Sequence, residues 1–235
     1  MKFNTTGTAG LFLMLGVILF ASGAVNTSVA DSSSDNDNCE ALAQNGDDLY
    51  EAGDFAGARE MYLRCIDTYD LNEEGSPAHA ARSAFMIGEI IRLDYDTLAV
   101  SAETVQQKAH LKNDVEEWYA KSITYNVDVW FIASSVRAGE LYENFGNAVY
   151  SMEIPESIDE EAIDEFYAQL NEQFYEPEIQ KAINIYATAI KKAVSADISN
   201  EWVDTAVENL RRLAPGEGEA TSILLPGDYA MPYVP

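Results

Sequence analysis

The sequence predicts an all-α protein, a short α-solenoid of stacked helical hairpins, because one pattern of two amphipathic helices occurs three times. Each first helix has a glycine in its apolar stripe, and each second helix has a tyrosine between small or apolar residues. The first-helix sets are Leu42-Gly46-Leu49, Ala84-Gly88-Ile91 and Ser135-Gly139-Tyr142. The second-helix sets are Ala58-Tyr62-Cys65, Val115-Tyr119-Ser122 and Ala182-Tyr186-Ala189. A hairpin of this kind cannot bury its apolar face alone, so neighbouring hairpins are expected to stack.

Residues 1–30 are expected to be a signal peptide that is not part of the folded domain. The apolar run at residues 11–21 is too short to span a bilayer, but it suits the core of a signal peptide. Small residues at Ser28 and Ala30 favour cleavage after Ala30, which predicts a periplasmic or otherwise exported protein with no membrane span after cleavage. An uncleaved anchor is the alternative. Residues 31–38 form a polar leader that is expected to be disordered.

Export favours a disulfide between Cys39 and Cys65, the two cysteines of the chain. In an oxidising compartment a disulfide is favoured over a metal site or a nucleophile. A hairpin turn near Gly53 and Asp54 would place the two cysteines at neighbouring ends of antiparallel helices. The bond would contribute about 3–4 kcal/mol in the chain-entropy model. Two unpaired buried thiols are the alternative.

A helical domain is expected over residues 39–213. Ser76-Pro77 suits a helix start, Ser157 with Glu160 forms a capping box, and Pro177 suits the first turn of a long helix. The expected elements are a hairpin at 39–69, helices at 78–93 and 107–126 around an insertion at 94–104, a helix at 129–150, an inserted acidic helix at 157–174, and helices at 176–195 and 199–213.

Two of these elements have particular expected roles. The inserted helix would bury Ile158, Ala162, Phe166 and Leu170 and turn its carboxylates to water. The last helix would cap the stack, with Arg211 and Arg212 placed favourably at the negative end of its dipole.

Helical character is expected to end in a tail at residues 214–235, which is rich in proline and glycine. The tail nevertheless contains apolar residues, among them Leu224, Leu225 and Tyr233. Either it packs on the helices of its own chain, or it is an extended docking peptide for another protein.

The formal net charge of −26 disfavours binding to nucleic acids or anionic membranes. The acidic residues are spread over every predicted helix. They are therefore interpreted first as an adaptation to saline surroundings, in which self-repulsion is screened. A basic partner is the alternative.

The first hairpin closely resembles a tetratricopeptide repeat (TPR). The residues that match the family spacing are Leu42, Gly46, Leu49, Gly53, Ala58, Tyr62 and Cys65, with cysteine where alanine is usual. The intervals from Gly88 to Val115 and from Gly139 to Ala182 are longer than the one from Gly46 to Ala58, so the later units carry insertions.

A second resemblance covers about residues 78–213. It is to the C-terminal region of exported TPR proteins of gliding-type bacteria. The matching segments are WYAKSITYNVDVWFIASSVRAGELYENFGNA, YEPEIQKAINIYATAIKKA and ISNEWVDTAVENLRRLAP. In those proteins the region belongs to large periplasmic scaffolds, some of them in the gliding-motility machinery of the envelope. The resemblance implies a periplasmic scaffold or adaptor.

The TPR resemblance also implies a binding groove. First helices line the concave face of a TPR stack, and residues one and four positions after the glycine often point into it. Here these are Asp47, Tyr50, Glu89, Arg92, Glu140 and Glu143. This mainly acidic set would suit a basic or amphipathic peptide. A solvated acidic face is the alternative.

Catalysis has little support in the sequence. The two histidines, His79 and His110, lie on separate predicted helices without metal-ligand spacing, and no nucleophile elbow or phosphate-binding loop occurs. We therefore expect no catalytic, cofactor-binding or metal-binding residues. The expected function is that of a non-enzymatic periplasmic scaffold or adaptor that binds another envelope protein. The alternative is a module that binds a small ligand or peptidoglycan fragment between the inserted helix and the third hairpin. The oligomeric state is left open.

Overall fold

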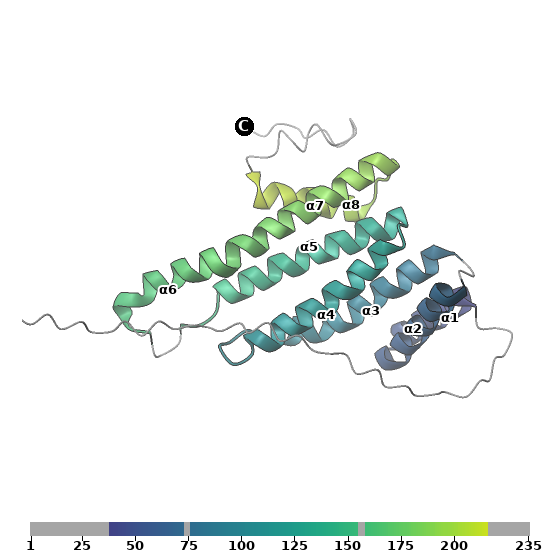
Figure 1. Ribbon diagram of the computed structural model, residues 1–235, viewed down its shortest axis with the longest axis horizontal. Coiled ribbons are helices and arrows are strands. Elements are labelled where there is room, and N and C mark those ends of the chain that lie inside the picture. The colour runs from purple at the N-terminus through teal and green to yellow at the C-terminus, as the bar shows by residue number, and fades with distance from the viewer. Residues whose placement is uncertain (1–37, 73–75, 155–157, 216–235) are drawn as a thin grey trace, which may run out of the picture. The chain divides into compact units, whose positions relative to one another are not determined.

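The computed structural model describes residues 38–72, 76–154 and 158–215, and the regular structure of these residues is helical, without strands. The predicted all-α class is therefore confirmed (Figure 1). The helices are α1 (Cys39–Glu51), α2 (Phe55–Asn72), α3 (Pro77–Thr97), α4 (Val105–Thr124), α5 (Asp128–Tyr150), α6 (Ile163–Leu170), α7 (Glu176–Ala196) and α8 (Glu201–Leu213). The predicted signal peptide, the leader up to residue 37, Ser157 and the tail from residue 216 lie outside the described residues.

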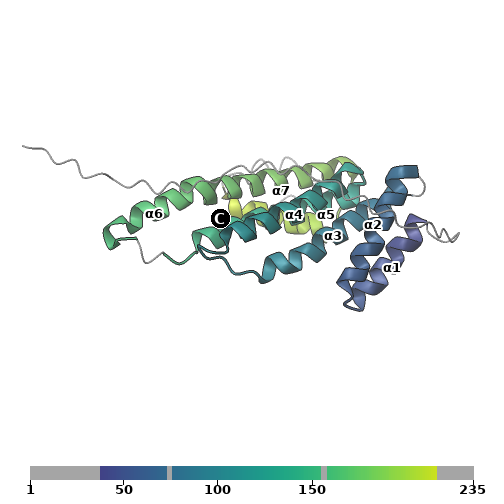
Figure 2. The same ribbon diagram turned by 60° about the horizontal axis from the view of Figure 1, so that its bottom comes forward.

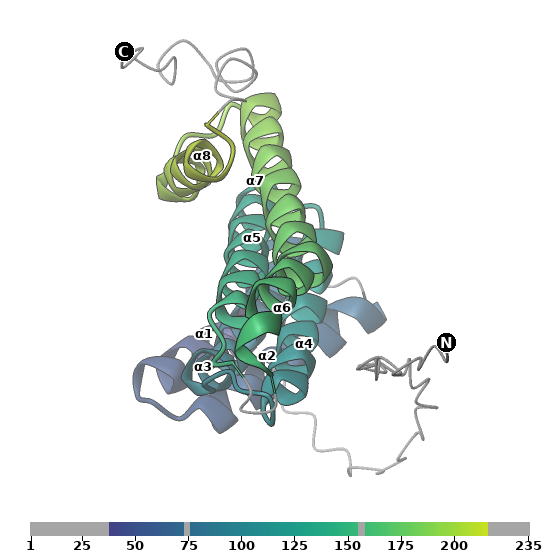
Figure 3. The same ribbon diagram turned by 90° about the vertical axis from the view of Figure 1, so that its left-hand side faces the viewer.

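The described helices pack as hairpins that follow one another along the chain. Helix α1 pairs with α2, α3 with α4, and α5 with α7, and each hairpin contacts the next (Figure 2). The first helices of successive hairpins also meet, since α3 contacts both α1 and α5. Helix α8 then packs on α7 and α5, where the first helix of a further hairpin would lie (Figure 3).

Each hairpin contains one close contact between a glycine and a tyrosine ring. A Cβ atom added to Gly46, Gly88 or Gly139 would lie 2.5–2.6 Å from the ring opposite it. The rings belong to Tyr62, Tyr119 and Tyr186, which are fully buried. The repeated sequence pattern therefore marks one repeated packing contact, because only glycine lets the first helix approach the ring this closely.

Helix ends follow the local chemistry of the sequence. The side chain of Asn38 accepts a hydrogen bond from the Ala41 N–H, and the side chain of Asn200 accepts one from the Val203 N–H. Ser76 caps α3 in the same way, with Pro77 as the first helical residue. The turn between α1 and α2 contains Gly53 with φ +79°, a conformation that glycine adopts without strain.

The sulfur atoms of Cys39 and Cys65 lie at bonding distance (2.10 Å), as predicted, and join α1 to α2. Both cysteines are buried in a cluster with Leu42, Ala43 and Ala80. The disulfide therefore fastens the first hairpin at the end opposite its turn.

Helix α3 is longer than expected, because it continues to Thr97 instead of ending near residue 93. Tyr95 is buried, which gives the added turn an apolar anchor. The Lys108 ammonium group donates hydrogen bonds to the carbonyls of Tyr95 and Leu98 (2.9 Å to Leu98), so the end of the helix is satisfied.

The prediction of a separate inserted helix ending near residue 174 was wrong. Helix α6 continues into α7 through a π-helical turn, Asn171–Tyr175, without an intervening loop. Of the four residues expected to be buried on the inserted helix, only Leu170 is buried, and Ile158, Ala162 and Phe166 are half-buried. Among the described residues, no helix is long and apolar enough to cross a bilayer.

Candidate functional site

The acidic groove candidates pair with arginines on neighbouring first helices. Asp47 on α1 forms an ion pair with Arg82 on α3. Glu89 on α3 pairs with Arg137 on α5 at 2.9 Å, and Glu143 on α5 pairs with Arg212 on α8 at 2.7 Å. Each junction between successive first helices, with α8 as the last, is therefore bridged by a carboxylate and a guanidinium group.

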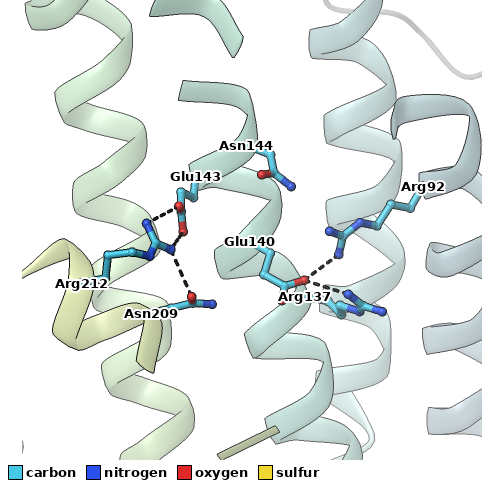
Figure 4. A pocket seen from close by; sticks show the side chains of 7 residues that line it. All are labelled: Arg92, Arg137, Glu140, Glu143, Asn144, Asn209 and Arg212. Atoms are coloured by element: carbon cyan, nitrogen blue, oxygen red, sulfur yellow. Dashed lines mark hydrogen bonds and ion pairs between the residues drawn. The ribbon is translucent and has the colours of Figure 1, made fainter. Parts of the chain in front are cut away.

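Glu140 lies at the centre of this set. One of its oxygens accepts hydrogen bonds from Arg92 at 3.0 Å and from Arg137 at 2.9 Å, as Figure 4 shows. Burial lowers the pKa of the Arg92 guanidinium, but Tyr119 and Glu140 outweigh this effect and raise the pKa overall. Arg92 therefore stays charged beside these partners.

The packing tyrosines carry polar tips that reach the same face. Tyr62 donates a hydrogen bond to Asp47 at 2.8 Å, and Tyr119 donates one to Glu89. The hydroxyl of Tyr186 instead accepts one from the Asn209 amide at 3.2 Å. The tyrosine hydroxyls therefore hold two of the candidate carboxylates and the side-chain amide of Asn209 in place.

Tyr50 is the groove candidate that does not join this network. Its ring lies half-buried, edge-on to the ring of Phe55, with the centroids 5.3 Å apart. It therefore belongs to the packing at the turn between α1 and α2.

An open pocket of about 340 Å³ lies between α3, α5 and α8. The side chains around it come from all three helices, and Arg212 contacts both Glu143 and Asn209 (Figure 4). The lining residues are Arg92, Arg137, Glu140, Glu143, Asn144, Asn209 and Arg212. The site brings together three of the groove candidates, and the other four lining residues were missed by sequence reasoning. For one of them a signal was available, since Arg137 lies three residues before the candidate Glu140 and therefore on the same face of α5.

Two tryptophans extend the face beside this pocket. The Arg137 guanidinium carbon lies 5.2 Å from the ring centroid of Trp202, and that of Arg82 lies 6.0 Å from Trp130. The ring of Phe85 lies between the two tryptophans, with centroids 5.4 and 5.9 Å away. Both tryptophans are half-buried: Trp202 packs against two of the core clusters and Trp130 against one, and each keeps part of its surface exposed.

His79 lies on α3 and His110 on α4. Within residues 38–72, 76–154 and 158–215, no group of three histidine, cysteine or acidic side chains is arranged to hold a metal ion. A comparison with protein-family models, curated proteins and solved structures found no match to this chain.

Proposed function

We propose that this protein is an exported TPR-like scaffold or adaptor that binds another envelope protein through the face formed by α3, α5 and α8. The observation that carries this proposal is the combination of arginines, partly exposed tryptophans and an open pocket on that face. Arginine and tryptophan are the residues most enriched where protein interfaces gain their affinity. Apposed hairpins hold these side chains on rigid helices, so little conformational entropy would be lost on binding.

The ion pairs on this face reduce the negative charge that could attract a basic partner. A basic peptide was expected because the candidate set is mainly acidic, but Glu89, Glu140 and Glu143 are paired with arginines. A long-range attraction to a basic peptide is therefore weaker here than the sequence suggests. We propose that recognition depends mainly on contacts with the tryptophan rings and on hydrogen bonds with the pocket amides.

Site-specific photocrosslinking in cells tests the proposal. A photoreactive amino acid at Asn144, which is exposed at the pocket, should capture one distinct protein. The same amino acid at Ala120, exposed on α4, is the control and should not capture that protein. Capture of nothing at position 144, or of the same proteins from both positions, would contradict a partner bound at this face.

A small ligand is the second candidate function. The pocket volume of about 340 Å³ lies at the lower end of the range for small-molecule sites. This pocket lies between α3, α5 and α8, whereas the position expected for a small ligand, between the inserted segment and the third hairpin, has an open hollow of its own of about 450 Å³. A ligand that binds only the folded protein must raise the melting temperature. Thermal-shift screening with peptidoglycan fragments therefore distinguishes this function from a scaffold.

A further inference from the structure

A second surface lies at the C-terminal end of α5, where three partly exposed tyrosine rings meet. The ring centroid of Tyr150 lies 5.8 Å from that of Tyr167 and 5.2 Å from that of Tyr175. Tyr150 is 39% exposed, and the other two rings are half-buried. We call these three residues the tyrosine surface. None of them lines the pocket between α3, α5 and α8.

The π-helical turn and Gly146 bring this surface together. A Cβ on Gly146 would lie 3.3 Å from the Glu178 side chain and 3.6 Å from the Tyr175 carbonyl, so the turn lies close against α5. An open hollow of about 450 Å³ lies beside Tyr175. Its lining is Glu172, Tyr175, Glu176, Pro177, Ile179 and Gln180. Aromatic, aliphatic and carboxylate groups therefore share one concave surface.

The segment that contains Tyr167 and Tyr175 is acidic in sequence. Residues 151–177 contain nine acidic residues and no lysine, arginine or histidine. Glu172 and Glu176 are exposed, and no ion pair joins either of them to a basic side chain in the part of the chain that the structure describes. This contrasts with the pocket face, where Glu140 and Glu143 are neutralised by arginines. The unpaired negative charge is therefore beside the tyrosines and not in the groove.

We propose that the tyrosine surface and its hollow dock a basic polypeptide segment of a partner protein. An arginine or lysine side chain would lie over the ring of Tyr150 or Tyr175 and direct its charge toward Glu172 and Glu176. A cation over an aromatic face is attracted by the ring, and the planar guanidinium of arginine also stacks on it. This contact goes beyond the proposed function, because it involves a different surface and a partner of defined charge.

Peptide binding to the purified protein tests this contact directly. The probe is a fluorescent peptide of alternating arginine and serine, and the comparison peptide has citrulline in place of each arginine. Citrulline keeps the shape of the side chain but has no charge. Fluorescence anisotropy should show binding of the arginine peptide at low salt, weakened by salt, and about tenfold weaker binding of the citrulline peptide. No binding of the arginine peptide, or equal binding of both peptides, would overturn the proposal.

Variants assign the binding to this surface. Tyr150→Leu and Tyr175→Leu keep apolar bulk but remove the ring, and each should weaken binding about two- to fivefold. The double variant Glu172→Gln/Glu176→Gln should weaken it about threefold or more. Its control, Asp114→Asn/Glu117→Gln, removes the same charge from exposed positions on α4 and should leave the affinity unchanged. If the control pair weakens binding as much as the test pair, the peptide responds only to total charge and the site is refuted. Circular dichroism confirms that each variant is folded.

Discussion

Tyr62, Tyr119 and Tyr186 each have two roles: the ring packs inside a hairpin, and the hydroxyl forms a hydrogen bond at the protein surface. Each ring fills the space left by a glycine, and each hydroxyl reaches a polar group at the surface of the neighbouring helix. The role of these residues in packing could be predicted from their spacing, and their burial confirms it. Their hydrogen bonds could not, because a hydroxyl at the end of a ring can reach several carboxylates and only the packing selects one.

Gly88→Ala tests the glycine–tyrosine contact. The added Cβ would lie 2.6 Å from the ring of Tyr119, which is fully buried and cannot move aside, so we expect a loss of about 1–3 kcal/mol in the free energy of unfolding. The control is Gly57→Ala on α2, where the atoms nearest to the added Cβ belong to the carboxylate of exposed Asp54. Urea denaturation should show a change of less than about 1 kcal/mol for the control. Equal effects of the two substitutions would contradict the repeated contact.

The same tyrosines predict a loss of stability at alkaline pH. Burial raises the pKa of Tyr62, Tyr119 and Tyr186 above the ordinary value, and nearby carboxylates raise it further. Above about pH 10 the unfolded chain releases these protons while the folded protein keeps them, so stability must fall as pH rises. Melting temperatures from about pH 9 to pH 11 measure this slope. Tyr119→Phe should make it shallower, and an unchanged slope in this variant would refute the assignment.

At the scale of helices, the segment between α5 and α7 departs most from the sequence-based expectation. Pro177 was interpreted as the start of a separate helix, because proline has no N–H to donate and clashes with the preceding turn. In the structure the π-helical turn Asn171–Tyr175 widens the helix just before Pro177, so α6 and α7 run on without a loop. A pattern of single residues does not reveal such a turn, whereas the cap at Ser76 follows directly from local chemistry. Asn38, which was expected to belong to the disordered leader, caps α1 instead.

Serine substitutions test the packing of α3 and α5. Ser83 and Ser134 lie five residues before Gly88 and Gly139, and each has a buried hydroxyl without a hydrogen-bond partner among the described residues. Ser83→Ala and Ser134→Ala should leave the free energy of unfolding unchanged or raise it slightly. In contrast, the buried hydroxyl of Ser122 donates to the Ala81 carbonyl at 2.8 Å, so Ser122→Ala should lower the free energy by about 1 kcal/mol. Urea denaturation measures the free energy of unfolding of all three variants. A larger loss for the Ser83 or Ser134 variant than for the Ser122 variant would contradict the prediction, because it would mean that the deleted hydroxyl makes a hydrogen bond in the folded protein.

The disulfide should stabilise one hairpin in particular. Cys39→Ala/Cys65→Ala is expected to lose about 3–4 kcal/mol of stability, because the loop that the bond closes is free in the unfolded chain. Hydrogen exchange should become faster in α1 and α2, while α5 and α7, which do not contact the bond, change little. Reductant should reproduce this pattern in the wild type and have no effect on the variant. Uniformly faster exchange in all helices would contradict a local role.

Across the described helices, ion pairs join segments that lie far apart in the chain. Asp47 and Arg82 are 35 residues apart, Arg92 and Glu140 are 48 apart, and Glu143 and Arg212 are 69 apart. The TPR resemblance implied that first helices line a binding face, and three of the residues chosen on that basis line the pocket. The partners of these residues depend on how successive hairpins are packed. Arg212 was therefore assigned to its own helix dipole, although it contacts Glu143 on α5.

The central claim is that the face of α3, α5 and α8 binds a protein partner, and two neighbouring arginines on α8 test it most directly. Arg212 lines the pocket, whereas Arg211 is exposed and does not line it. The measurement is the affinity of the partner captured at position 144 for the variants Arg212→Ala and Arg211→Ala. We predict that Arg212→Ala weakens binding about tenfold and that Arg211→Ala leaves it unchanged. Equal affinities of the two variants would contradict the claim.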